Sequence, residues 1–533
     1  MKYGVLILVV CIAALGVLFW RANGPGAKAR TQPKLQGPIF NYDCTEFFYP
    51  GTVREGVDGG ALVDHYVDLL ADAGVKIMMC NPNARRTNYR SGVWESFWDG
   101  YDPKGPDDQP FMRPIPEKDR ATWRRMVHSM WELDRQGVDW PGRIIARCRA
   151  RGISPWISLR MNDVHCNDNL EHPFHGALFR QEKYFRGPGG GVSSYYARGL
   201  DYAHPEVRDA YRALIEEVLQ RYDLDGLELD FMREPYLFAP DAEKDGAMIL
   251  YAWLGQIRLL TDAAAARRGH PVRLGVRVPS RVEVAQGWGL DAVSWARAGL
   301  VDLIVPTPRF ATLEYDMPLD EWREQLADTK ATLAGGLERL HQPVPGGPRA
   351  GANAEQAAGA ATAVLNAGAD AVYLFNYFDY PANQSQTLRA MSSLETISAL
   401  PRRHAITWRD IVGPGENYQA PLPATGKVLC FQLPTGPRPA REAEVTLIVQ
   451  VKGAPAPAAA AVNETACELI QSTATTNGYT VLEYRVPLAA LPGNRRDAIA
   501  LTADEEITVV DVEVRIVPPA AKSAIRQAPE KKP

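Results

Sequence analysis

Residues 204–230, HPEVRDAYRALIEEVLQRYDLDGLELD, predict one helix followed by one buried strand. Pro205 suits the first turn of a helix, where a backbone N–H is not needed. Apolar side chains then recur at helical spacing and make a single stripe: Val207, Tyr211, Leu214, Ile215, Val218, Leu219 and Tyr222. The run from Leu224 to Asp230 after this stripe is short and rich in leucine, which is typical of a strand.

The same order of helix, glycine and apolar run recurs along the chain from residue 38. Glycine suits the end of a helix because it adopts the left-handed conformation found there. Strands are predicted near residues 38–43, 75–80, 153–159, 224–230, 272–278, 300–305, 332–337 and 371–376. Eight such units favour a closed barrel over an open doubly wound sheet, which usually has fewer strands. We therefore predict an α/β fold in which residues 37–403 form a (β/α)8 TIM barrel.

The sequence pattern changes after about residue 403. Apolar residues alternate with other residues over 445–451, 480–486 and 510–516. Alternation at period two is typical of antiparallel strands. We therefore predict that residues 404–518 form a C-terminal antiparallel β-sandwich. Residues 519–533 are predicted to be a disordered tail.

The first residues predict export. The run between Gly4 and Trp20 contains no charged residue, while Lys2 precedes it and Arg21 follows it. A terminal run of this kind is typical of a signal peptide or of a single membrane anchor. We interpret residues 1–36 as such a segment plus a polar tether. The rest of the chain is then expected to be exported, and therefore periplasmic, extracellular or anchored to the membrane facing outward.

Composition excludes several classes of protein. The 533 residues are 46% hydrophobic and 23% charged, which is ordinary for globular domains. The net charge is -4, so no basic excess favours a nucleic-acid partner. No G-x-G-x-x-G motif follows the first predicted strand, and no C-x-x-C pair occurs. We therefore expect no cofactor and no bound metal. The sequence leaves the oligomeric state open.

Acidic residues in the strand at 224–230 indicate where the chemistry lies. Period two places Gly226, Glu228 and Asp230 on one face and the leucines on the other. Because the leucines suit packing against helices, both acids should project into the barrel. The same alternation points Arg160 and Arg277 inward, so these four charged side chains are expected to form one ring. Such a ring could serve only to hold the strands together, although aliphatic residues would do so at a lower desolvation cost.

Polar residues at the ends of other predicted strands complete a candidate active site, because the carboxyl ends of barrel strands form the catalytic face. Glycoside hydrolysis needs a proton donor and a second carboxylate. We assign Asp230 as general acid opposite Glu338, with Glu228 orienting Asp230 or contacting sugar hydroxyls. Asp163 is the alternative to Glu338. The residues predicted to bind substrate are Asp43, Asn81, Arg160, Asn162, Asp163, His165, Arg233, Arg277 and Asn376.

Two long insertions are expected to cover this face, roughly residues 81–140 and 160–204. Aromatic residues predicted near the mouth, such as Phe47 and Tyr49, suit a sugar cleft because flat sugar faces stack on aromatic rings.

The segment from His204 to Asp209, continued by Tyr222 to Arg233, resembles the barrel proteins described as family-10-type glycoside-hydrolase-like. The Asp225-Gly226 turn followed by inward acids is also similar to the fourth strand of family 18 chitinases, although the D-x-x-D-x-D-x-E motif of that family does not occur. Family 10 xylanases carry Asn-Glu on strand four, where this chain has Leu229-Asp230. The resemblance covers residues 38 to about 400. It implies an exported glycoside hydrolase that acts on a poly- or oligosaccharide, and it does not imply xylanase activity.

Two other functions stay open at this stage. The chain could be a non-catalytic carbohydrate-binding surface protein in which the charged ring is structural. It could also be a metal-dependent hydrolase, for instance a deacetylase, that uses Asp163 with the loop histidines His165, His172 and His175. The spacing of these histidines matches no metal motif.

Overall fold

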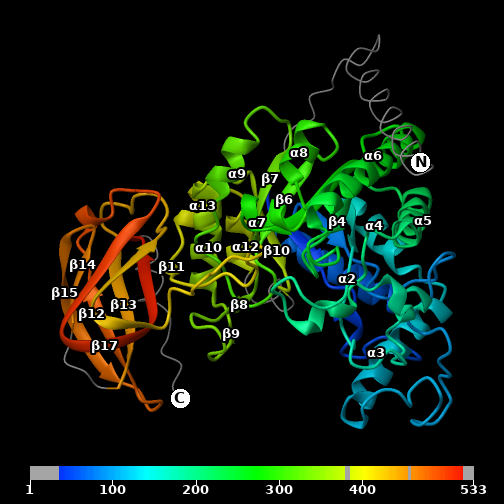
Figure 1. The fold of residues 1–533 in the computed structure, drawn as a ribbon, viewed down its shortest axis with the longest axis horizontal. Coiled ribbons are helices and arrows are strands. Elements are labelled where there is room, and N and C mark those ends of the chain that lie inside the picture. Colours follow the sequence, from blue (N-terminus) through cyan, green and yellow to red (C-terminus); the bar gives the residue numbers. More distant parts are fainter. Residues whose placement is uncertain (1–34, 378–384, 454–457, 520–533) are drawn as a thin grey trace.

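The computed structural model describes residues 35–377, 385–453 and 458–519. It contains a barrel surrounded by helices and, beside the barrel, a β-sheet region formed by the C-terminal part of the chain (Figure 1). The predicted signal peptide or anchor lies almost entirely outside the described residues, as does the predicted C-terminal tail. Within the described ranges no helix combines the length and the apolar character that crossing a membrane requires. The six cysteines of these ranges are free thiols.

Eight parallel strands close into the barrel, and each overlaps a strand predicted from the sequence. They are β1 (Ile39–Tyr42), β2 (Ile77–Cys80), β3 (Ser154–Arg160), β4 (Gly226–Asp230), β5 (Arg273–Pro279), β6 (Leu303–Thr307), β7 (Thr332–Leu337) and β10 (Ala371–Phe375). Each strand pairs with the next in this order, and β10 pairs back with β1. The predicted (β/α)8 barrel is therefore confirmed.

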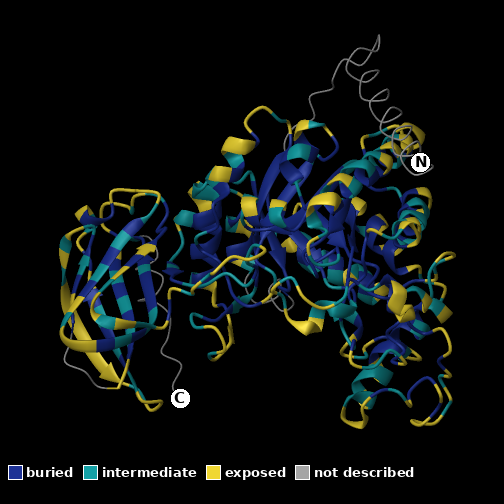
Figure 2. Cartoon of the chain, in the orientation of Figure 1, coloured by how far each residue is buried: buried dark blue, intermediate teal, exposed yellow. Residues whose placement is uncertain are grey.

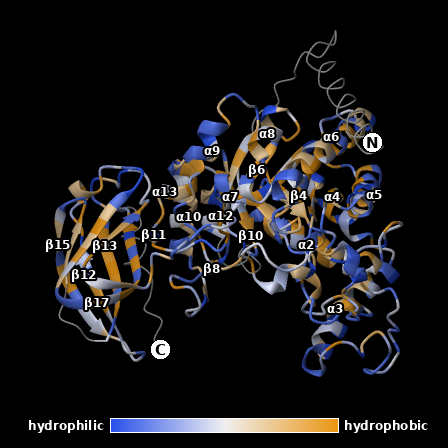
Figure 3. Ribbon diagram, in the orientation of Figure 1, coloured by the Kyte–Doolittle hydropathy of each residue, from blue (hydrophilic) through white to orange (hydrophobic). Residues whose placement is uncertain are grey.

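Helices cover the outside of the barrel. Helix α5 (Pro205–Arg221) begins at the predicted proline and buries the predicted apolar stripe from Val207 to Leu219. The other α-helices of this region are α2 (Gly59–Asp72), α3 (Glu117–Arg135), α4 (Trp140–Ala150), α6 (Glu243–Arg268), α7 (Val282–Gly287), α8 (Ala292–Arg297), α9 (Leu319–Gln325), α10 (Ala354–Asn366), α12 (Ser385–Ala390) and α13 (Leu394–Ser398). The strands are buried and largely apolar, while charged residues gather on the outer helix faces (Figure 2, Figure 3).

A tryptophan fills the lower end of the barrel. Trp156 points inward from β3 and is fully buried. Its neighbour in the register is Gly226 on β4, where an added Cβ would lie 2.4 Å from the indole ring. On the next strand an added Cβ at Gly275 would lie 3.2 Å from the same ring. The two glycines thus give the indole its space, and the polar residues of β4 begin one layer higher, at Glu228.

The C-terminal region is one antiparallel sheet with its own apolar core. Its strands are β11 (Arg402–Ala405), β12 (Ala424–Leu433), β13 (Glu444–Lys452), β14 (Ala459–Val462), β15 (Thr465–Ala474), β16 (Tyr479–Arg485) and β17 (Asp497–Val517). The long β17 pairs with β11, β12, β13 and β14, so the sheet rolls back on itself. The predicted antiparallel β architecture is confirmed. Helix α10 of the barrel packs directly against β11, so the two regions share an interface.

Gly226→Ala tests the packing of the barrel interior. We expect it to lower the free energy of unfolding by about 1–3 kcal/mol, because the new methyl group meets a buried ring that has no space to move. Urea unfolding followed by circular dichroism measures the effect. The control is Gly255→Ala in α6, where an added Cβ meets nothing within 4 Å and alanine favours the helix. Equal unfolding midpoints for Gly226→Ala and the wild type would contradict this account.

Candidate active site

Glu228 lies at the centre of the barrel and is held by uncharged partners. Its Oε1 accepts hydrogen bonds from Ser158 Oγ at 2.7 Å, Tyr373 Oη at 2.7 Å and Asn41 Nδ2 at 3.3 Å. Burial and the nearby charge of Asp230 raise the pKa of Glu228 to about 7. This carboxyl group therefore holds a proton over part of the neutral range. The sequence predicts that Glu228 takes part in a ring with Arg160 and Arg277, but among the described residues it forms no ion pair with an arginine.

Asp230 occupies the next layer and forms a buried ion pair. Arg277 Nε donates to Asp230 Oδ1 at 2.8 Å, and the backbone N–H of Met232 donates to the same oxygen at 2.9 Å. The guanidinium of Arg277 lies 3.8 Å from the centre of the Phe375 ring. Its two terminal nitrogens are buried and have no hydrogen-bond partner among the described residues. Arg277 thus presents two free donors in the layer of Asp230.

Arg160 departs from the ring that the sequence predicts. It lies beside Asp230 in the register, but its guanidinium pairs with Asp43, in a short contact, and with Asp163 at 3.2 Å. Burial opposes ionisation of Asp43, yet Arg160 and Arg233 lower the pKa of Asp43 to about 2. The physical reason is that β1 ends only two strands away from β3, with β2 between them, so Asp43 offers Arg160 a partner nearer the mouth than Asp230.

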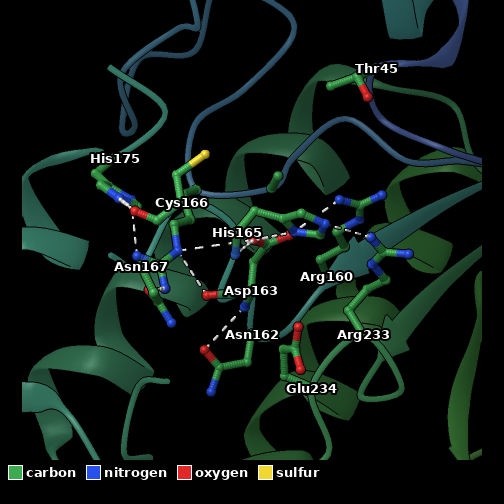
Figure 4. A network of polar contacts seen from close by, with 12 residues as sticks. Thr45, Arg160, Asn162, Asp163, His165, Cys166, Asn167, His175, Arg233 and Glu234 are labelled. Carbon is green, nitrogen blue, oxygen red and sulfur yellow. Dashed lines mark hydrogen bonds and ion pairs between the residues drawn. The ribbon is translucent and has the colours of Figure 1, made fainter. Parts of the chain in front are cut away.

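A chain of polar contacts continues from Asp163 (Figure 4). Asp163 Oδ1 accepts from His165 Nδ1 at 2.9 Å, and His165 Nε2 accepts from Arg233 Nη2 at 3.4 Å. Burial favours the neutral form of Asp163, but its contacts with His165 and Arg160 lower its pKa well below the usual range. Among the described residues Arg233 has no carboxylate within ion-pair distance. It therefore keeps donors free for a ligand.

Glu338 follows β7 and is the second acid assigned to catalysis. Its Oε1 accepts from the backbone N–H of Arg339 at 2.8 Å, and its Oε2 accepts from Asn376 Nδ2 at 3.2 Å. Only 1% of the residue is exposed, and this burial raises the pKa of Glu338 to about 8. Glu338 is therefore protonated at neutral pH. Asn376 has a φ of 62°, so the chain turns sharply where β10 ends.

A pocket of about 720 Å³ opens at this end of the barrel. The predicted residues that line it are Asp43, Arg160, His165, Arg233 and Asn376. Its aromatic lining consists of Phe47, Tyr49, Tyr66, Trp123, Phe174 and Phe310. Trp123 on α3 and Phe174 come from the two long insertions, which therefore cover the mouth as expected. Glu228, Asp230, Arg277 and Glu338 do not line the pocket and lie deeper in the barrel.

Two predicted substrate ligands serve the backbone instead. Asn81 Nδ2 donates to the carbonyl of Ser158 at 2.7 Å and so joins the ends of β2 and β3. Asn162 donates to the carbonyl of Leu200 and accepts from its N–H, both at 3.0 Å. Neither side chain lines the pocket. Asn376 does line the pocket. The position of an asparagine at a strand end in the sequence did not show which of the three would face the pocket and which would bind backbone groups.

The loop histidines do not gather around one point with Asp163. His175 contacts Arg85 and the carbonyl of Cys166, and His172 accepts from the N–H of Phe174. Burial lowers the pKa of both histidines to about 4. In the ranges that the structure describes, these residues form no group close enough to hold a metal ion. The geometry gives the metal-dependent alternative no ligand set at this loop.

Sequence reasoning missed three inward residues, Asn41, Tyr373 and Phe375. Asn41 and Tyr373 bind Glu228, and Phe375 packs against Arg277. The sequence contained the pattern that predicts them. Alternate residues of a strand point to the same side, so Asn41 shares a face with Asp43, and Tyr373 shares a face with Phe375.

No protein-family model and no curated protein sequence matches this chain. Among solved structures, it is similar to a cycloisomaltooligosaccharide glucanotransferase from Paenibacillus sp., with 10% identity and a TM-score of 0.34 over 91% of this chain and 58% of the other. It is similar to a chitinase from Paenibacillus sp., with 12% identity and a TM-score of 0.38 over 91% of this chain and 41% of the chitinase. It is also similar to an α-galactosidase from Geobacillus stearothermophilus, with 10% identity and a TM-score of 0.35 over 85% of this chain and 55% of the galactosidase.

These three proteins are carbohydrate-active enzymes, and the chain spans about half the length of each. Similarity at this level does not transfer an activity or a set of site residues. The family-10-type resemblance is not confirmed by the comparisons and stays a prediction.

Glu338→Gln tests the protonation of this acid. The folded pKa of about 8 lies above the ordinary value of 4.5, so between these pH values the folded chain holds a proton that the unfolded chain has lost. The stabilising effect of this proton is complete below the unfolded pKa and is lost as pH rises toward the folded pKa. The free energy of unfolding should fall by about 1.4 kcal/mol per pH unit across this window. The glutamine variant lacks this contribution because its side chain does not titrate. Asn376 can turn its amide and still bind the glutamine.

Urea unfolding at a series of pH values provides the measurement. The stability of Glu338→Gln relative to the wild type should increase between about pH 5 and about pH 8. The control is Glu283→Gln on the exposed first turn of α7, which should show a constant difference. A constant difference for Glu338→Gln as well would show that this carboxyl group is ionised in the folded state.

Proposed function

We propose that the chain is an exported glycoside hydrolase that binds a saccharide in the mouth pocket and cleaves it with Glu338 and Asp230. The observation that carries this proposal is the contrast between the two acids. Glu338 lies away from any ion pair and has a pKa raised to about 8 by burial, whereas Asp230 is paired with Arg277 at 2.8 Å. Glycoside hydrolysis needs one protonated and one charged carboxyl group at the same site.

The proposed roles reverse those assigned from the sequence. Glu338 donates a proton to the oxygen of the leaving sugar, because it holds a proton at neutral pH. Asp230 acts as the second carboxylate, either as nucleophile or as base toward water. The free terminal nitrogens of Arg277 lie in the same layer as Asp230 and can hold a substrate oxygen or the attacking water. Glu228 supports Asp230 from the layer below.

The pocket supplies the features that bind sugars. Aromatic rings such as Trp123 and Phe310 offer surfaces for the flat faces of sugar rings. Arg233, His165 and Asn376 offer hydrogen-bonding groups for hydroxyl oxygens.

Cleavage also requires the saccharide to reach one layer deeper. Asn376 lines the pocket and binds Glu338 from above, and Arg233 lines it next to Asp43 and His165. We propose that a bound sugar displaces these two side chains by taking over their hydrogen bonds. The sugar would then meet Glu338 and the free nitrogens of Arg277.

A second candidate is a carbohydrate-binding protein without hydrolase activity. The observation that favours it is that Glu228, Asp230 and Glu338 all lie outside the pocket lining and are each bound to neighbouring residues. In this case the deeper polar layers would only hold the strands together.

Asp230→Asn and Glu338→Gln separate the two candidates. A saccharide panel screened by calorimetry first identifies a ligand, and hydrolysis of that ligand is then followed by chromatography. We expect each variant to lose at least about 10²-fold in kcat while it still binds the saccharide. The activity of the wild type should fall above about pH 8, where Glu338 loses its proton.

Trp123→Ala is the matched control for recognition, because Trp123 lines the pocket away from both acids. It should weaken binding by about tenfold with a smaller effect on kcat. Binding without turnover in the wild type would reject the hydrolase and leave the binding protein. Turnover unchanged in Asp230→Asn would reject the catalytic assignment.

A further inference from the structure

The junction between the barrel and the C-terminal sheet holds three side chains with metal-binding atoms. His341 lies in β8 (Leu340–His341), a short strand that follows β7 and pairs with β9 (Ala350–Gly351). Asp511 and Glu513 lie two residues apart on β17, so their side chains leave the same face of the strand. One ligand atom of each residue lies within 4.8 Å of the others, a grouping found nowhere else in the part of the chain that is described.

Several atoms of this group are buried without a partner. His341 is 8% exposed, and neither of its ring nitrogens makes a hydrogen bond. Asp511 Oδ1 is also buried and makes no hydrogen bond. A buried polar atom that loses water and gains no partner destabilises the folded protein. One ring nitrogen of His341 lies close to a carboxylate oxygen of Asp511 and one of Glu513. Unpartnered atoms gathered in this way point to a ligand that they share.

We propose that His341, Asp511 and Glu513 bind one divalent transition-metal ion, with Zn²⁺ as the best match. An imidazole nitrogen and carboxylate oxygens are ligands that Zn²⁺ accepts at about 2.0–2.2 Å. His341 Nε2 and Glu513 Oε1 are 3.8 Å apart, so an ion bonded to both fits between them. Water completes the coordination, because three protein ligands leave at least one position open. Ca²⁺ and Mg²⁺ prefer oxygen ligands and suit the imidazole poorly.

Neighbouring residues already hold Glu513 in place for this role. Gln356 Nε2 donates to Glu513 Oε1 at 2.8 Å, and Arg403 donates to Glu513 Oε2 at 3.0 Å. Gln356 is itself fixed, because it belongs to the capping box that begins α10 with Asn353. Outer partners of this kind orient a metal-binding carboxylate. The oxygen that faces His341 keeps a second lone pair for the ion.

The charges around the group favour a cation. Arg403 and Arg515 are two positive groups beside this cluster, and both bind Glu355. Arg403 also binds Glu513, which leaves Asp511 with no cation within ion-pair distance among the described residues. Three carboxylates therefore face two guanidiniums. A divalent ion removes the unbalanced charge and joins β8 of the barrel region to β17 of the sheet.

Metal binding to the full chain tests the site directly. The chain is purified without a polyhistidine tag, stripped with a chelator and titrated with Zn²⁺ by calorimetry. We expect one ion per chain and a rise in Tm of about 2 °C or more, since an ion that binds only the folded chain stabilises it. Ca²⁺ and Mg²⁺ in parallel titrations should produce no shift.

Two variants distinguish this site from adventitious binding. His341→Gln and Asp511→Asn should each abolish the Zn²⁺-dependent rise in Tm and weaken binding at least tenfold. Without metal, Asp511→Asn should be at least as stable as the wild type, because it removes a buried unpaired charge. His65→Gln, on the exposed face of α2, should leave Zn²⁺ binding unchanged.

Failure of the chain to bind Zn²⁺, or full binding by both variants, would overturn the proposal. A shift produced by Ca²⁺ and not by Zn²⁺ would overturn the assigned class of metal. These readouts need no saccharide and no turnover. The outcome is therefore independent of the proposed hydrolase activity.

Discussion

The buried ion pair between Asp230 and Arg277 is possible only because the barrel interior is divided into layers. Trp156 fills the lower layer, and its indole fits there because β4 and β5 carry Gly226 and Gly275 beside it. Above the indole, the same inward row of β4 becomes acidic. A charge in that position has lost its water, so it must either meet an opposite charge or bind a proton. Some acids of the barrel form an ion pair and others bind a proton, and this difference determines which acid–base reactions the site can support.

The distribution of arginines decides which acids stay charged. Arg277 pairs with Asp230, while Arg160 is drawn toward the mouth by Asp43 and Asp163. Among the described residues no arginine forms an ion pair with Glu228 or Glu338, and burial raises the pKa of Glu228 to about 7 and that of Glu338 to about 8. One barrel thus holds an ion-paired carboxylate together with carboxyl groups whose pKa is raised by burial. This arrangement, rather than the number of acids, is what makes acid–base catalysis a reasonable function for the site.

The strands and their inward faces could be predicted from the sequence because both depend on local rules. The apolar stripe of α5 and period two along β4 were enough to place Glu228 and Asp230 inside the barrel. The partner of Arg160 could not be predicted, because it depends on how closely the ends of β1 and β3 approach each other across β2 in the closed barrel. The depth of the pocket could not be predicted either, since it depends on how the two long insertions that carry Trp123 and Phe174 fold over the mouth. His341 comes about 170 residues before Asp511 and Glu513 in the sequence, so no spacing rule brings it to them.

The C-terminal region takes part in building the mouth rather than merely following the barrel. Asp410 lies between β11 and β12, and its carboxylate accepts the backbone N–H groups of Arg309, Phe310 and Ala311 at 2.7–2.9 Å. This contact fixes Phe310 in the pocket lining and lets Arg309 bind both oxygens of Glu234. A carboxylate that gathers three N–H groups holds a loop in one conformation. The position of the pocket wall therefore depends on how firmly the sheet is docked against the barrel, and residues at that interface can affect ligand binding without touching the ligand.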